Sequence, residues 1–199
     1  MSPHELPPKL QLRDGSTLEL EVFRPEDAPA LQTFYRAIPE EDRLYLKEDV
    51  CQDAWAQRFA ARVAEGAIIC VVAKANGVVV GEGSLHRALH GWMRHVGELR
   101  ITVAPDWRRK GLGRVLASSL VKIATDLGIE KIMAQVVEKQ AAARRIFQKL
   151  GFHQEAVLPR HIQDLSGAKR DLYLMANDVS QIWAAMESLV SDYSPDQGA

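Results

Sequence analysis

The chain has 199 residues, 47% of them hydrophobic, and a formal net charge of −1 at pH 7. This length suits one well-cored domain rather than two, so we expect a single domain over 1–199. The near-neutral charge excludes a global field that would attract nucleic acid or an anionic membrane. Cys51 and Cys70 have no paired spacing, which argues against a disulfide framework or a zinc site. The first eight residues have no signal-like apolar core and no apolar run could span a bilayer, so we expect a cytoplasmic protein.

Apolar periodicity predicts strands and helices in an alternating order. A hairpin-like segment over 10–23 ends in a strand from Leu18, and further strands are expected at 68–74, 78–86, 99–103, 131–137, 152–158 and 169–175. Helices are expected at 24–37, 53–64, 112–127, 143–150 and, as a terminal helix, within 178–191. Asp53 is the expected N-cap of the second helix, and the acidic stretch 39–49 is expected to be a connection. The strand at 131–137 directly follows a helix, which predicts a parallel βαβ unit.

One stretch, from Leu99 to Leu120, has the features of a phosphate site. Its strand alternates apolar residues with Arg100 and Thr102 and ends at Pro105, which cannot continue a ladder. Arg-Arg-Lys-Gly-Leu-Gly follows at 108–113, immediately before the helix. The glycines allow a close backbone approach, and the helix start presents unpaired N–H groups and the positive end of its dipole. This arrangement favours an anionic phosphate ligand.

Three motifs compete for this loop. A P-loop is excluded, because Arg114 and Val115 stand where Lys and Ser/Thr would be required. A dinucleotide fingerprint would need a third glycine at Leu116, although Glu138 could imitate its ribose-binding acid, and this alternative stays open. The third interpretation is the pattern Arg-x-x-Gly-x-Gly over 108–113.

This third pattern resembles the pyrophosphate-binding motif of the GNAT superfamily of N-acetyltransferases. A second segment, from Ala143 to Phe152, resembles the family's Ala-x-x-x-Tyr-x-x-x-Gly-Phe segment, with Phe147 in place of the tyrosine. The resemblance covers a core of about 18–177. It implies an α/β (α+β) GNAT fold: a mixed, mostly antiparallel twisted sheet of six to seven strands, with helices on both faces and a splayed strand pair that binds coenzyme A.

The resemblance also implies acetyl-CoA as co-substrate and a set of binding residues. The strand would pair with the pantetheine arm, the loop would hold the pyrophosphate, and Gln140 stands about where the family commonly has an asparagine. The implied positions are Ile101, Thr102, Val103, Arg108, Arg109, Lys110, Gly111, Leu112, Gly113, Arg114 and Gln140. Which of the three cations at 108–110 would reach the 3′-phosphate is left open.

For catalysis, the resemblance implies direct attack of an amine on the thioester, with a carboxylate that takes the proton. Glu98, at the start of the 99–103 strand, matches the family position and is the expected catalytic residue, and Glu82 is the second candidate. Phe147 has no hydroxyl to protonate the leaving thiolate. Ser118, Ser119 and Tyr173 are then the alternatives, although their spacing does not favour any of them.

We therefore expect an N-acetyltransferase that acts on a primary amine of a small molecule or a protein. No nucleic-acid or membrane partner is expected, and a homodimer fits the family. The alternatives are a non-catalytic acyl-CoA sensor and, more distantly, a nicotinamide-binding oxidoreductase. His86, His90 and His95 match no metal template, so no metal is expected. His90, Trp92, Arg94 and His95 could border the acceptor pocket, and the acidic residues between 40 and 49 could wall it.

Overall fold

One sheet organises the chain in the computed structural model, which describes residues 6, 9–164, 166–182 and 184. The sheet has eight strands in the order β1-β2-β3-β4-β5-β6-β8-β7. The strands are β1 (Leu10–Gln11), β2 (Thr17–Val22), β3 (Ile68–Ala75), β4 (Val78–Arg87), β5 (Val96–Val103), β6 (Lys131–Val137), β7 (His153–Gln163) and β8 (Lys169–Asp178). The pair β5–β6 is parallel and the other neighbouring pairs are antiparallel.

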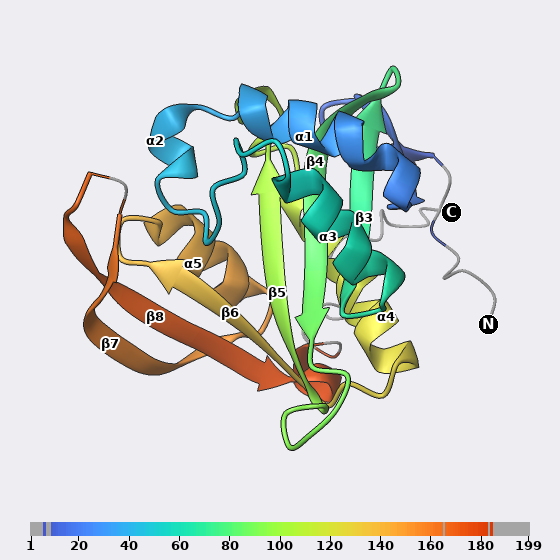
Figure 1. The fold of residues 1–199 in the computed structure, drawn as a ribbon. Coiled ribbons are helices and arrows are strands. Elements are labelled where there is room, and N and C mark those ends of the chain that lie inside the picture. The colour runs from blue at the N-terminus through green and yellow to red at the C-terminus, as the bar shows by residue number, and fades with distance from the viewer. Residues whose placement is uncertain (1–5, 7–8, 165, 183, 185–199) are drawn as a thin grey trace, which may run out of the picture.

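Helices cover both faces of this sheet (Figure 1). The α-helices are α1 (Ala28–Ala37), α2 (Glu40–Arg43), α3 (Trp55–Ala64), α4 (Leu112–Asp126) and α5 (Ala141–Lys149), and two 3₁₀ turns are η1 (Pro25–Asp27) and η2 (Pro105–Trp107). Strand alternation sends Val71 and Ala73 into one core with α4 and α5, and Cys70 and Val72 into another with α1 and α3. The polar side chains of the site described below lie on the face of the sheet that α1 and α3 cover.

Helix α4 packs closely against the middle of the sheet. Leu116 and Leu120 are fully buried, and burying each such side chain stabilises the fold by roughly 1.5–3 kcal/mol. A Cβ at Gly83 in β4 would lie 2.8 Å from Leu120 Cδ1 and 3.3 Å from Leu116 Cβ, so glycine there leaves room for the helix to lie close to the strand. This packing holds the N-terminus of α4 at the end of β5.

Strands β5 and β6 form a fork. They pair only over Val96↔Lys131, Gly97↔Ile132 and Glu98↔Met133, and from Leu99 onward the paired residues of β5 in the described part of the chain face β4 alone. Beyond the fork, β6 continues to pair with β8. Figure 1 shows the two strands diverging. The predicted splayed pair is therefore present in the fold.

Three details differ from the sequence-based expectations. The eighth strand, β1, is only two residues long, too short to show alternation. The acidic connection contains the short helix α2, whose three acidic residues suit a helix N-terminus. Asp53 is not the N-cap of α3: Ala54 occupies that position, and the carboxylate of Asp53 instead pairs with Arg36 at 2.6 Å. The predicted terminal helix at 178–191 lies mostly outside the described residues.

Candidate active site

A pocket of about 130 Å³ lies in the fork. Its walls come from four regions: β5 from Glu98 to Thr102, β6 at Gln135 and Val136, α5 and its N-cap, and the connection between α2 and α3. Side chains of α1, α3 and β4 close its inner end. The cavity is small beside the roughly 300–1,000 Å³ of typical drug-sized sites, so it suits a small group.

Glu98 lies at the apex of this pocket and its side chain is only 17% exposed. Its carboxylate accepts hydrogen bonds from Arg100 Nε at 3.0 Å, from Arg100 Nη2 at 3.3 Å and from Lys47 Nζ. Burial by itself raises the pKa of Glu98, but the bonds and charges of Arg100 and Lys47 outweigh it and hold this pKa below its usual value. Glu98 is therefore ionised at neutral pH and already neutralised by two cations.

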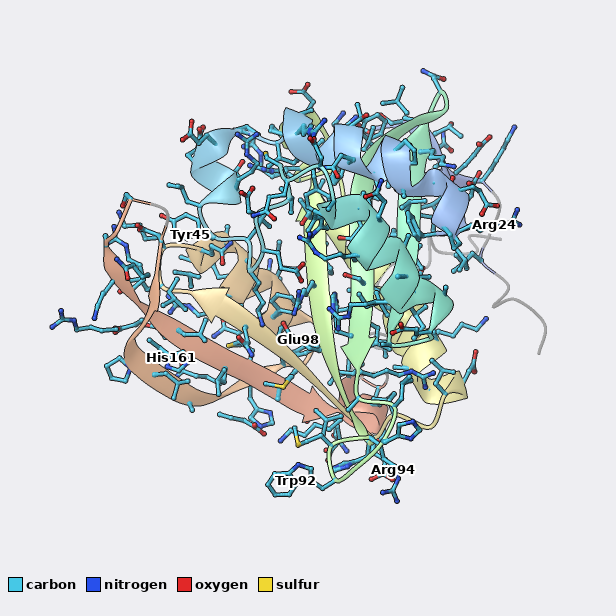
Figure 2. The ribbon with its side chains drawn as sticks, in the orientation of Figure 1. Arg24, Tyr45, Trp92, Arg94, Glu98 and His161 are labelled. Atoms are coloured by element: carbon cyan, nitrogen blue, oxygen red, sulfur yellow. The ribbon has the colours of Figure 1, made fainter. Side chains whose placement is uncertain are left out.

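The two cations reach Glu98 from different parts of the chain. Arg100 lies two residues along β5, on the same face of the strand, and also pairs with Glu48 at 3.7 Å. Lys47 comes from the α2–α3 connection, 51 residues away in sequence. Burial, together with the positive charge of Arg100, lowers the pKa of Lys47 below its usual value by more than pairing with Glu98 raises it. Figure 2 shows Glu98 beneath this connection.

A row of polar side chains on β4 faces the same side of the sheet. Glu82 is fully buried, and its carboxylate accepts a hydrogen bond from the Tyr35 hydroxyl at 2.8 Å and from Cys70 Sγ at 3.5 Å. Burial raises the pKa of Glu82 despite these donors and Ser84. Among the described residues Glu82 is not part of the lining of the fork pocket, and its carboxylate is bonded within this buried network.

His86 continues the row and lines the pocket. Its Nε2 lies 3.1 Å from Ser84 Oγ, while its buried Nδ1 has no hydrogen-bond partner among the described residues. Burial and the nearby charge of Arg100 lower the pKa of His86 to about 3, so the ring is neutral at physiological pH. The strand expected at 78–86 is present as β4, which extends one residue further, through Arg87, and His86 is buried in the interior.

The loop at 108–113 has the predicted helix-start geometry. Gly111 is the N-cap of α4 with φ of 96°, a left-handed conformation that glycine adopts without strain. The first bonds of the helix run from Arg114 and Val115 N–H to the Gly111 carbonyl, so the N–H groups of Leu112 and Gly113 have no acceptor inside the helix. A Cβ at Gly111 would meet no atom within 4 Å, which shows open space beside the loop. These features fit an incoming phosphate.

The three cations of this loop differ in their engagements. Arg108 donates to the Val103 carbonyl at 3.1 Å and to Asp42 at 2.7 Å. Lys110 pairs with Asp14 at 3.0 Å and lies 4.9 Å from the centre of the Trp107 ring. Among the described residues, Arg109 has no recorded hydrogen-bond or ion-pair partner, and its φ of 62° places it at a sharp turn. Among the three cations, Arg109 thus has the fewest hydrogen-bond and ion-pair partners in the described structure.

Helix α5 contributes the other wall of the pocket. Gln140 Oε1 accepts the Val137 N–H at 3.1 Å, which closes the β6–α5 turn, and Gln140 lines the pocket. Phe147 also lines it and packs edge-on against Phe152 at 5.1 Å. Neither offers a hydroxyl. Tyr45, which the sequence analysis did not single out, lines the pocket from the α2–α3 connection.

Other suggested residues lie elsewhere. Within the described residues, the lining of the fork pocket contains none of Ser118, Ser119, Tyr173, His90, Trp92, Arg94 and His95. Trp92, Arg94 and His95 line a separate hollow beside the β4–β5 loop, and Figure 2 shows Trp92 and Arg94 at its tip. The loop follows the paired ends of β4 and β5 and so points away from the fork. Of the acidic residues at 40–49, Glu48 reaches the pocket wall.

Comparison with known proteins identifies the family. The model of the acetyltransferase (GNAT) family matches residues 28–152. The chain belongs to the GNAT family. It is 31% identical over 146 residues to the L-amino acid N-acyltransferase MnaT of Escherichia coli, covering 72% of this chain and 84% of that protein. It is 32% identical over 80 residues to the [ribosomal protein bS18]-alanine N-acetyltransferase of Escherichia coli, a match that spans 53% of that enzyme.

Solved structures agree with this assignment. A structure of yncA from Salmonella typhimurium with its cofactor acetyl-CoA has a TM-score of 0.67 and 25% identity, covering 81% of this chain and 94% of that one. A GNAT acetyltransferase from Streptococcus pneumoniae shares the fold with a TM-score of 0.68. This GNAT protein is an N-acetyltransferase that uses acetyl-CoA. No helix among the described residues is long and apolar enough to cross a membrane, and no cluster of metal-ligating side chains occurs among them.

Proposed function

We propose that this GNAT protein acetylates the α-amino group of a small amino acid or a close analogue, and that Glu98 takes the amine proton. The position of Glu98 at the apex of the fork carries the proposal, because the acceptor amine and the thioester must meet in this small pocket. The similarity to an L-amino acid N-acyltransferase over most of that enzyme supports the choice of substrate class.

The charges of the pocket match a zwitterion. Glu98 offers a carboxylate for the ammonium group, and Arg100 on the same wall would exchange its contact with Glu48, at 3.7 Å, for the carboxylate of the ligand. Arginine binds carboxylates through two parallel hydrogen bonds, which orients the ligand as well as attracting it. An amine without a carboxylate would use only half of this site, so we expect it to be a poorer acceptor.

Acetyl-CoA is proposed to enter along β5. The edge of β5 from Leu99 to Val103 has no strand partner on the fork side among the described residues, so Ile101 and Thr102 can pair with the pantetheine amides. The N–H groups at Gly111–Arg114 would hold the pyrophosphate, and Arg109 would reach the 3′-phosphate. Gln140 would flank the arm from the other strand of the fork.

The proposed reaction is a direct transfer. An alkyl ammonium, with a usual pKa of about 10.4, must lose its proton before its nitrogen can attack the thioester carbon. Glu98 accepts that proton, the C–N bond forms, and the C–S bond breaks with the electron pair leaving on sulfur. The nitrogen loses a further proton to water as the neutral amide forms. Lys47 and Arg100 lower the pKa of Glu98, and an acceptor ammonium that displaces Lys47 would take over its hydrogen bond to the carboxylate.

The thiolate needs little help to leave. A thiol has a usual pKa of about 8.5, so its anion is a tolerable leaving group at neutral pH. Phe147 provides no proton, and Tyr45 is a hydroxyl on the pocket wall that could do so. We propose Tyr45 as the group that protonates the thiolate, in place of the alternatives Ser118, Ser119 and Tyr173. Those three are not among the described residues that line the fork pocket.

Thiol release from acetyl-CoA tests the proposal with paired acceptors. L-phenylalanine would be compared with phenethylamine, and L-alanine with ethylamine. The two amino acids would also be compared with a peptide that has an N-terminal alanine and with a lysine-containing peptide. We expect each free amino acid to have a higher kcat/KM than its decarboxylated partner. This difference should be lost in Arg100→Gln. Faster release with the peptides would instead place this chain with the ribosomal-protein enzymes.

Two further results would contradict the proposal. Tight acetyl-CoA binding without release for any acceptor would favour the non-catalytic sensor. Binding of a nicotinamide nucleotide in place of acetyl-CoA would favour the oxidoreductase. We also propose a cytoplasmic location, supported by the unpaired Cys51 and Cys70, and a homodimer, which sedimentation of the purified chain would measure.

A further inference from the structure

The fork pocket already contains an amine of the chain itself. Lys47 Nζ donates a hydrogen bond to Glu98, the contact that the proposed mechanism assigns to the acceptor nitrogen. Among the described residues that line this pocket, Lys47 carries the one primary amine. Its side chain is 34% exposed, so two thirds of it is withdrawn from water beside the base.

We propose that the protein acetylates itself on Lys47, which acts as an intramolecular acceptor when no substrate amine is bound. The inference rests on the proposed role of Glu98. Lys47 passes its ammonium proton to the Glu98 carboxylate, which later returns it to water. The neutral Nζ attacks the thioester carbon, the C–N bond forms, and the C–S bond breaks with its electron pair on the coenzyme A thiolate. The nitrogen loses its second proton to water as the neutral amide forms.

Two features make this lysine a suitable nucleophile. Its burial lowers its pKa, so a larger fraction is neutral at a given pH than for an exposed lysine. Its place on the pocket wall replaces a bimolecular encounter by a positioned one, which favours reaction. Acetylation removes the charge of Lys47, so the Lys47–Glu98 ion pair is lost and Glu98 keeps Arg100 as its cationic partner.

Lys131 is a matched control within the same chain. Its side chain is 33% exposed and pairs with a glutamate, Glu155, at 2.5 Å, but it does not line the fork pocket. Acetylation of Lys131 by free acetyl-CoA therefore gives the background rate of a similarly exposed, glutamate-paired lysine outside the pocket. The difference between the two lysines measures transfer at the site.

The experiment incubates the purified full chain with acetyl-CoA and no acceptor. We expect peptide mass spectrometry to show Lys47 acetylated at least about tenfold faster than Lys131. The first-order rate should be independent of protein concentration. Thiol release should stop after about one equivalent per chain, as expected for one internal nucleophile. Lys47→Arg keeps a cation beside Glu98 and should abolish this release, and Glu98→Gln should slow Lys47 to the Lys131 rate.

A mixing test separates self-modification from transfer between copies. Isotope-labelled Gly113→Asp chain, which should not bind acetyl-CoA, is mixed with unlabelled wild type. Acetyl on Lys47 of the labelled chain would overturn the intramolecular inference. Equal rates at Lys47 and Lys131, in a protein that acetylates an amine of the acceptor panel, would also overturn it and leave the proposed function intact. Loss of acetyl-CoA binding together with all transfer would contradict both.

Discussion

Glu98 of β5 and Met133 of β6 are the last residues that the two strands pair before they diverge. The residue immediately after this junction on β5 already lacks a partner on the β6 side among the described residues. The Glu98 carboxylate thus lies at the point where β5 and β6 stop pairing. An extended ligand can add to the open edge and bring its reactive end to Glu98.

Replacing Glu98 tests the junction chemically. Glu98→Gln keeps the shape but cannot take a proton, so we expect kcat to fall by roughly 10²–10⁴-fold. The KM for acetyl-CoA should change little, because the proposed contacts of that substrate lie beyond the fork. Glu155→Gln, a lysine-paired glutamate outside the pocket, is the control and should retain the wild-type rate. An unchanged kcat in Glu98→Gln would remove Glu98 from the mechanism.

Gly113 tests the phosphate loop without disturbing the fold. The nearest atom to a Cβ at Gly113 is Val103 Cγ2 at 4.0 Å, so Asp fits, and a carboxylate in the first turn suits the helix dipole. Gly113→Asp should therefore keep its melting temperature while calorimetry shows at least about 100-fold weaker acetyl-CoA binding through repulsion of phosphate. The neutral isostere Gly113→Asn should bind better than Asp. Gly111→Asp should also lose binding, but it adds backbone strain at φ of 96°.

Variants of Arg109 and Arg108 should have different effects on the affinity for coenzyme A and for dephospho-coenzyme A. Arg109→Gln should weaken coenzyme A binding by roughly 10–100-fold, the value of a charge-assisted hydrogen bond, and leave the affinity for dephospho-coenzyme A nearly unchanged. Arg108→Gln removes the contacts to Asp42 and Val103 and should affect both ligands equally. The reverse pattern would assign the 3′-phosphate to Arg108.

His86 predicts a component of acid instability. Its pKa falls from the ordinary histidine value of 6.5 to about 3 in the folded protein. The unfolded chain therefore binds a proton more readily, and the stability that neutral His86 contributes is complete above pH 6.5 and declines as the pH falls towards 3. The slope is at most about 1.4 kcal/mol per pH unit.

Denaturant unfolding between pH 7 and pH 4 measures this component. His86→Gln keeps a polar side chain but does not titrate, so the difference in unfolding free energy between wild type and variant should shrink as the pH falls. Glu82, whose pKa is raised by burial, acts in the opposite direction and is present in both proteins. Parallel curves for the two proteins would show that the pKa of His86 is not lowered in the folded state.

Much of the fold could be predicted because its signals are local. Alternation and helical spacing located the principal elements, and the strands expected at 68–74 and 78–86 pair as the β3–β4 hairpin. The loop at 108–113 was predicted for the same reason: Gly111 needs a positive φ and the helix start needs its orphan N–H groups, both of which are properties of neighbouring residues. The two-residue strand β1 and the helix α2 were too short to leave a periodic signal.

The chemistry at Glu98 depended on distant residues. The sequence by itself determined the GNAT resemblance, the candidate loop and a carboxylate at the start of β5. Only the tertiary structure brought Lys47 onto Glu98 and buried His86 in the pocket wall, because the packing of α1 and α3 in the second core decides where the α2–α3 connection lies. The sequence of that connection has no apolar periodicity from which its position could be predicted. Local sequence therefore specifies the elements, whereas long-range packing decides which side chains meet between them.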